Sequence, residues 1–252
     1  MTGLEELAVF GAGMAAGTIN TIVGSGSLIT FPTLLAIGYP PVVANVSNTV
    51  GLVPGSVSGA LGYRRELAGQ GRRLVRLGTL SGLGGLTGAV LLLVLPASAF
   101  KAIVPALIAI ACVLVLVQPA ITRRMEQRQR NDSAEGGFPL LAGIFGAGVY
   151  GGYFGAAQGV LLMGLLGLGL RESLQRINAA KNVLAAIVNG VAAVLFMFVA
   201  HVAWRPALLI AAGAILGGQV GARVGRRLPP AVLRIVIVAV GVVAIVRLVG
   251  GG

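Results

Sequence analysis

Neutral polar side chains beside breaks in apolar segments are the residues of this sequence whose types and spacing could do chemistry. In the first half of the chain they are Ser25, Ser27, Asn45, Asn48 and Thr49. The two serines lie in a Gly-Ser-Gly-Ser run that interrupts an otherwise apolar stretch. A broken helix points unpaired backbone N–H groups and the positive end of its dipole at the break. This combination predicts a binding site for a small anion.

A second polar set follows in the other half of the chain, and it consists of Gln158, Asn178, Lys181 and Asn182. Lys181 lies near the predicted start of a helix, where a cation opposes the helix dipole, so another interaction must favour it. A constant shift of 133 residues pairs Asn48 with Lys181 and Thr49 with Asn182. We therefore expect the two sets to face each other across a pseudo-twofold axis. Two alternatives stay open: these amides and hydroxyls join helices by ordinary hydrogen bonds, or Lys181 anchors its helix at the membrane interface.

The composition shows which elements must position these residues. Of the 252 residues, 56% are hydrophobic and 10% are charged, and the mean hydropathy is +0.94. A helix that crosses a bilayer needs about 20 mostly apolar residues. Several stretches meet this need, including 74–95, 102–118, 183–200 and 231–249. Because lipid cannot satisfy backbone polar groups, each stretch is predicted to be a helix.

The charged residues exclude several classes of function. In a soluble protein the net charge of +12 would suggest nucleic acid. Here the arginines lie between apolar stretches, as expected of cytoplasmic loops, so no nucleic-acid partner is predicted. All seven carboxylates lie at the N-terminus or in predicted loops, and the single histidine, His201, lies in a predicted external turn. No cluster of metal ligands follows from this pattern, so we predict neither a metal nor a cofactor.

An internal repeat relates the two halves. The shift of 133 residues places Asn45 on Asn178, Gly88 on Gly221 and Pro96 on Pro229. Farther upstream, Phe-Gly-Ala-Gly occurs at 10–13 and again at 145–148, a shift of 135. A shift held without gaps over this distance predicts two structurally equivalent halves.

The positive charges predict that the halves are inverted. The connection before residue 74 is basic in the first half, whereas its equivalent, 201–206, carries only Arg205. The turn around Pro96 carries only Lys101, whereas the turn around Pro229 is basic. Under the positive-inside rule, equivalent connections then lie on opposite sides of the membrane. The linker, with Arg123, Arg124, Arg128 and Arg130, is predicted to be cytoplasmic.

The predicted fold is an all-α integral membrane protein with two inverted-topology repeats. The first repeat covers 1–118, a cytoplasmic basic linker covers 119–137, and the second repeat covers 138–252. Each repeat is predicted to be a broken or re-entrant hairpin followed by three transmembrane helices. Glycine-interrupted hairpins at corresponding places of inverted halves indicate a central binding site.

Two motifs give the chain a family resemblance. The Gly-Ser-Gly-Ser break with its following Phe31-Pro32, the stretch Ala-Asn-Val-Ser-Asn-Thr at 44–49 and their weaker duplicates resemble the TauE/SafE sulfite exporter family. The likeness extends from about residue 9 to 249. It implies a multi-pass carrier of the bacterial cytoplasmic membrane for sulfite, organosulfonates or related small anions. The family's break is often Gly-x-Gly-Gly-Gly, and here serines and Gln158 add donors, which leaves the oxyanion open.

The resulting expectation is export of a small anion by alternating access, with the bilayer and the anion as partners. A homo-oligomer is compatible with the sequence, which gives no oligomeric state. An anion channel is one alternative, because inverted half-helices also build pores. A membrane-embedded hydrolase with Ser25 or Ser27 as nucleophile is the other, but His201 is placed too far away to act as base. We therefore expect no enzyme activity.

Overall fold

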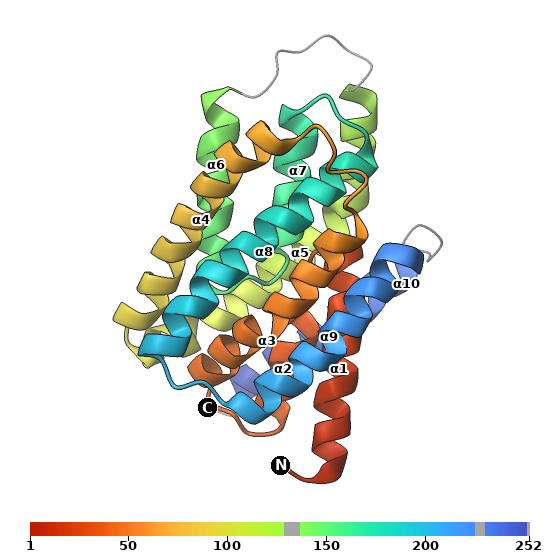
Figure 1. Ribbon diagram of the computed structural model, residues 1–252. Helices are drawn as coiled ribbons and strands as arrows, with labels where there is room; N and C mark the ends of the chain where they lie inside the picture. The colour runs from red at the N-terminus through yellow and green to blue at the C-terminus, as the bar shows by residue number, and fades with distance from the viewer. Residues whose placement is uncertain (129–136, 225–229, 251–252) are drawn as a thin grey trace.

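The chain folds into α-helices. A computed structural model describes residues 1–128, 137–224 and 230–250, and these residues form ten helices and no strand (Figure 1). The helices are α1 (Gly3–Ile22), α2 (Ser27–Ala36), α3 (Pro41–Gly62), α4 (Gly71–Val94), α5 (Ala97–Arg128), α6 (Phe138–Tyr153), α7 (Gln158–Gly169), α8 (Leu174–Val199), α9 (Trp204–Val224) and α10 (Pro230–Gly250). The prediction of an all-helical protein is confirmed.

Four of the described helices are long and apolar enough to cross a membrane: α4, α5, α8 and α9. The predicted stretches 74–95 and 231–249 match α4 and α10 closely, whereas 102–118 and 183–200 cover only parts of the longer helices α5 and α8. Local signals set several helix starts. A capping box between Thr2 and Glu5 begins α1, and the Ser173 side chain accepts a hydrogen bond from Arg176 N at the start of α8.

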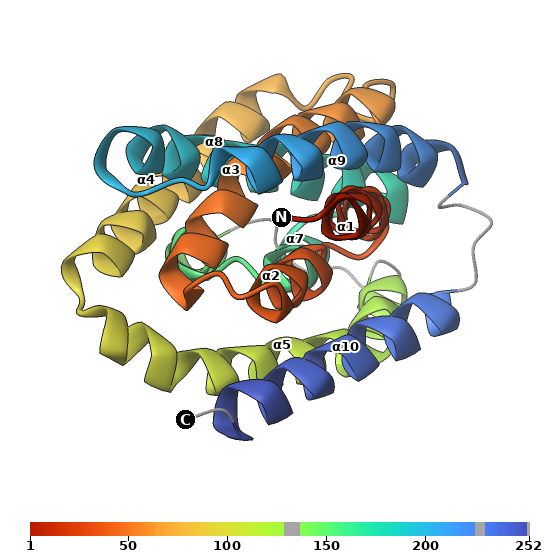
Figure 2. The same cartoon turned by 90° about the horizontal axis from the view of Figure 1, so that it is seen from below.

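The two glycine-rich breaks each fold the chain back on itself. Between α1 and α2, Gly24 has a φ of +88°, and between α6 and α7, Gly155 and Ala157 have φ values of +76° and +59°. Left-handed backbone of this kind ends a helix and permits a sharp turn. Viewed from below, α1, α2 and α7 lie between a layer that contains α3, α8 and α9 and a layer that contains α5 and α10 (Figure 2).

The pair α1 and α9 and the pair α6 and α4 are packed in the same way, with glycines at the contact. A methyl group on Gly84 of α4 would lie 3.0 Å from Val149 N of α6. A methyl group on Gly217 of α9 would lie 2.9 Å from Thr18 N of α1. The absence of side chains at these glycines therefore lets two pairs of backbones approach closely. Gly84 and Gly217 are 133 residues apart.

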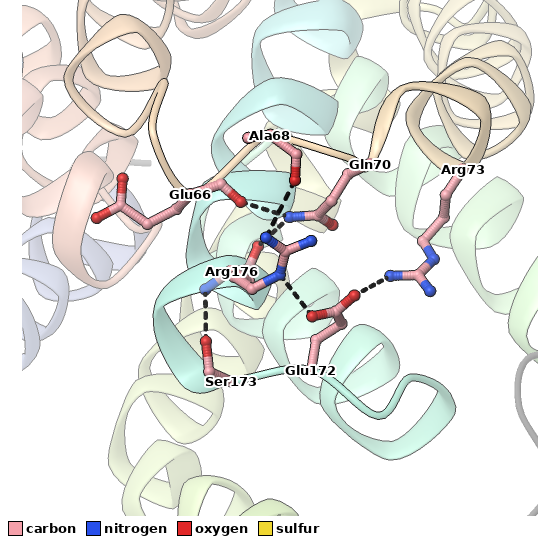
Figure 3. A network of polar contacts seen from close by, with 7 residues as sticks. All are labelled: Glu66, Ala68, Gln70, Arg73, Glu172, Ser173 and Arg176. Atoms are coloured by element: carbon pink, nitrogen blue, oxygen red, sulfur yellow. Dashed lines mark hydrogen bonds and ion pairs between the residues drawn. The ribbon is translucent and has the colours of Figure 1, made fainter.

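The connections from α3 to α4 and from α7 to α8 lie together at one end of the molecule, which is the upper end in Figure 1. Glu172 joins them, because Arg73 Nη1 donates to its Oε1 at 2.7 Å and Arg176 Nε to its Oε2 at 2.6 Å (Figure 3). Arg176 Nη1 also donates to Ala68 O at 3.1 Å. At the opposite end, Arg205 forms an ion pair with Glu6.

Parts of the predicted topology fall outside the described residues. These are the basic turn around Pro229 and residues 129–136 of the linker. The arginines of the described connections, 64–76 and 171–176, share the end at which the linker leaves α5 (Figure 1). This common end is called the arginine end below.

Candidate functional site

The two hairpin breaks meet inside the molecule. Gly159 N, in the first turn of α7, donates a hydrogen bond to Gly24 O at 3.0 Å. A methyl group on either glycine would collide with the backbone of the other. The contact between Gly24 and Gly159, called the junction below, therefore requires glycine on both sides. It brings the starts of two short helices together from opposite halves of the chain.

Both helices that begin at the junction have N-termini without a side-chain cap. The N-cap residue is Gly26 for α2 and Ala157 for α7, and neither makes a side-chain hydrogen bond to its helix. Several of the first N–H groups have backbone partners, such as Leu28 N with Ser25 O and Val160 N with Ala157 O. What each N-terminus still offers a ligand is about half a positive charge. Two partial positive charges thus face one small region, which is an arrangement suited to an anion.

Two buried side chains at the junction have polar atoms that lack a partner among the described residues. Ser25 is 1% exposed and Gln158 is 3% exposed, and neither Ser25 Oγ nor Gln158 Nε2 makes a hydrogen bond. Buried polar groups are nearly always hydrogen-bonded. The Gln158 amide nitrogen can only donate, and the Ser25 hydroxyl can donate too. The Gln158 amide lies against Gly151 of α6, and an oxyanion could accept a hydrogen bond from either side chain.

Lys181 lies on the α1 side of the first break. Its side chain is 0% exposed, and Nζ donates to Asn20 O at 3.1 Å and to Thr21 O at 3.2 Å. Asn178 Nδ2 and Asn182 Nδ2 both donate to Thr21 O at 3.3 Å. These carbonyls belong to the last turn of α1, where the dipole is negative and a cation is favoured. The position of Lys181 on α8 thus has a physical reason outside its own helix.

Asn45 of α3 makes the equivalent contact with the second hairpin. Asn45 Nδ2 donates to the carbonyl oxygen of Tyr153, the last residue of α6, at 3.0 Å. Thr49 is turned to its own helix, because its hydroxyl donates to Asn45 O at 2.9 Å. Asn45 and Asn178, which the shift of 133 pairs, each hold the carbonyl end of a helix from the opposite half.

Asn48 lies instead beside the start of α2. Its Nδ2 donates to Ser27 Oγ at 3.2 Å, and the Thr30 hydroxyl donates to its Oδ1. Asn48 and Lys181, which the shift of 133 pairs, therefore contact different helices. Thr49 and Asn182 also bond to different partners.

The structure thus arranges the predicted residues in groups. One group flanks the junction, a second holds the end of α1, a third lies at the start of α2, and two residues remain on α3. In that order the members are Ser25 and Gln158; Asn178, Lys181 and Asn182; Ser27 and Asn48; and Asn45 and Thr49.

Ser56 is a polar residue that sequence reasoning missed. Its Oγ accepts from Asn20 Nδ2 at 3.4 Å and from Asn189 Nδ2 at 3.3 Å. The signal was available, because Ser56 and Asn189 are 133 residues apart. Thr30 was missed as well, since a single threonine in an apolar helix carries no pattern of its own.

Comparison with known proteins identifies the family. Residues 9–248 match the family described as "Sulfite exporter TauE/SafE". The chain belongs to the TauE/SafE family. It is accordingly a multi-pass membrane transport protein, and the resemblance seen in its motifs is confirmed.

Curated relatives of the TauE/SafE chain carry transporter names without a substrate. It is 28% identical over 247 residues to the "Probable membrane transporter protein ORF9" of a Sinorhizobium species, covering 95% of this chain and 90% of the relative. It is 30% identical over 226 residues to a "Probable membrane transporter protein" of Haemophilus influenzae, covering 88% and 86%. YfcA of Escherichia coli K12, with the same description, is 28% identical over 220 residues, covering 85% and 78%. No solved structure matches the chain significantly.

Proposed function

We propose that this TauE/SafE protein is a carrier that exports a small oxyanion, sulfite or an organosulfonate, and binds it at the junction. The observation that carries the proposal is the pairing of two uncapped helix N-termini with the unpartnered Ser25 Oγ and Gln158 Nε2. Oxyanions present several acceptor oxygens and a negative charge, which match donors and positive helix ends together.

The remaining charges around the hairpins favour the same ligand. Donors from α8 and α3 cover the negative ends of α1 and α6, whereas neither α2 nor α7 has an acidic residue in its first turn to balance its positive end. Lys181 forms no ion pair with a carboxylate in the described part of the chain. A buried cation inside a membrane is normally paired, and a bound anion would supply the missing charge.

Alternating access between two inverted repeats, 1–118 and 138–252 joined by the linker 119–137, is the transport mechanism that we infer. Three pairs of equivalent helices begin 133 residues apart: α3 and α8, α4 and α9, and α5 and α10. The hydrogen bond between the equivalent residues Ser56 and Asn189 supports a pseudo-twofold axis through the molecule. Such an axis in the membrane plane would let the two halves rock about a shared site.

The arginine end is the cytoplasmic end in this proposal, and the protein lies in the cell inner membrane. An interior-negative potential favours anion exit by about 2.3 kcal/mol per elementary charge per 100 mV. Export therefore needs no coupled proton. The proposed function includes no catalysis. A serine nucleophile needs a base within hydrogen-bonding reach, and the only histidine of the sequence, His201, lies in the turn before α9.

A substrate panel in proteoliposomes tests the proposal. Sulfite and short sulfonates should show saturable flux, and Ser25→Ala or Gln158→Leu should lower it by about tenfold or more, as expected when a hydrogen bond to a charged ligand is lost. Ser81→Ala is the matched control, because Ser81 on α4 is also buried with an unpartnered Oγ, away from the junction. Flux that both junction variants leave unchanged would contradict the site. Flux that never saturates would indicate a channel.

A further inference from the structure

A cleft opens at the arginine end, away from the junction. It has a volume of about 310 Å³ and lies between the start of α4, the start of α6 and the end of α7. Its walls are formed by three arginines of α4 and by leucines of all three helices: Arg72, Arg73, Arg76, Leu77, Leu140, Leu141 and Leu170. One side of the cleft is therefore cationic and the other is apolar.

Two of the three arginines are available to a ligand. Arg73 is held by Glu172 at 2.7 Å (Figure 3). Arg72 and Arg76 are exposed, and neither has a hydrogen bond or an ion pair with another described residue. They lie four residues apart on one helix, where like charges destabilise each other. An anion between them would remove that repulsion.

Exposed apolar side chains of α4 border the cleft. On the same helix Val75, which lies between Arg72 and Arg76, is 71% exposed and Leu83 is 52% exposed, so apolar side chains are exposed both beside the arginines and farther along α4. A helix that crosses a membrane exposes such residues to lipid. The basic rim of the cleft thus borders the hydrocarbon layer.

We propose that this cleft binds one anionic phospholipid of the cytoplasmic leaflet. Arg72 and Arg76 hold the phosphate, and an acyl chain lies along the half-buried Leu141. A free phosphate or a transported oxyanion would gain nothing from the leucine wall, whereas a lipid buries apolar surface there. The net negative charge of the lipid suits the arginine end, because basic pockets between helices on the cytoplasmic side recognise anionic headgroups.

Lipid binding to the purified full chain tests this proposal in detergent. Phosphatidylglycerol is titrated while retained lipid is counted by native mass spectrometry, with phosphatidylcholine in parallel. Arg72→Gln/Arg76→Gln should weaken phosphatidylglycerol binding by about thirtyfold, since each arginine contributes roughly 1 kcal/mol. The lysine variant Arg72→Lys/Arg76→Lys should keep most of the affinity.

The control removes two arginines from the same end of the molecule but outside the cleft. Arg123 and Arg124 of α5 are exposed, and Arg123→Gln/Arg124→Gln should bind phosphatidylglycerol as the unaltered protein does. An equal loss in this control would overturn the cleft in favour of a diffuse charge effect. Unchanged binding in the cleft variant would overturn it directly. Glycerol 1-phosphate should not compete at millimolar concentration, and full competition by it would overturn the lipid in favour of a soluble phosphate.

Discussion

Asn189 Nδ2 lies 3.3 Å from Ser56 Oγ, and these two residues occupy equivalent positions in the two halves of the chain. A residue can touch its own equivalent only near the axis that relates the halves. Ile108 and Gly241, also 133 residues apart, repeat the relationship between α5 and α10, where a methyl group on Gly241 would lie 3.5 Å from Ile108 Cγ2. Both contacts are compatible with a pseudo-twofold axis through the protein.

The first prediction concerns the inversion of the repeats. Ala68 and His201 are equivalent under the shift of 133, and both are exposed. In a Cys112→Ala background, a cysteine at His201 should react with an impermeant maleimide in intact cells. A cysteine at Ala68 should react only after the cells are opened. Labelling of both positions in intact cells would contradict an inverted repeat.

The second prediction concerns the close packing of α6 on α4. A methyl group on Gly152 would collide with the backbone of Gly85, whereas nothing lies within 4 Å of one on Gly146. Gly152→Ala should therefore lower the free energy of unfolding by about 1–3 kcal/mol or more. Gly146→Ala on the same helix should leave it nearly unchanged. Unfolding of both variants in detergent measures this difference, and equal losses would refute the packing account.

The third prediction separates charge from structure at the end of α1. Lys181→Met and Asn182→Leu each remove one donor to Thr21 O, so each should cost about 1–3 kcal/mol of stability. Only the lysine variant removes a positive charge near the proposed site. Anion affinity should therefore fall far more in Lys181→Met than in Asn182→Leu. Equal affinities in the two folded variants would show that Lys181 acts as a helix cap alone.

The fourth prediction concerns pH. Burial raises the pKa of the Glu172 carboxyl, but hydrogen bonds and charges from Arg176 and Arg73 lower it by a larger amount. The net pKa therefore lies below its ordinary value of 4.5. A carboxyl with a lowered pKa contributes stability above its ordinary pKa, and the contribution is lost as the pH falls through the folded value. The unfolding temperature in detergent should drop below about pH 4.5. Glu172→Gln should flatten this acid-dependent drop, and an unaltered pH profile in that variant would contradict the role.

Much of the fold could be predicted because membrane-spanning segments are recognisable from their length and apolar composition. Runs of apolar residues long enough to span a bilayer gave the positions of α4, α5, α8 and α10, and the glycines at 24 and 155 gave the two breaks. The equivalence of Asn45 and Asn178 was visible as a constant shift. These features depend on local composition and on spacing, which a single sequence contains.

The candidate site was harder, because its contacts join distant parts of the chain. Lys181 bonds to Asn20 O across 161 residues, and no pattern near Lys181 indicates that the carbonyl end of α1 lies there. Thr49 was predicted as a site residue, yet its hydroxyl donates to Asn45 O, four residues earlier on the same helix. Threonines in apolar helices often make this bond. The proposed lipid site depends on which arginines Glu172 pairs with and which it leaves available to a ligand. Only the positions of the side chains show this pairing.

Anion flux at a fixed membrane potential tests the central claim most directly. The protein is reconstituted in proteoliposomes, and the potential is clamped with potassium and valinomycin while the pH gradient and sodium are varied separately. We predict saturable oxyanion efflux that an interior-negative potential stimulates, that survives proton uncouplers, and that Ser25→Ala and Gln158→Leu reduce. Flux that ignores the potential and follows the pH gradient would contradict an electrogenic anion carrier.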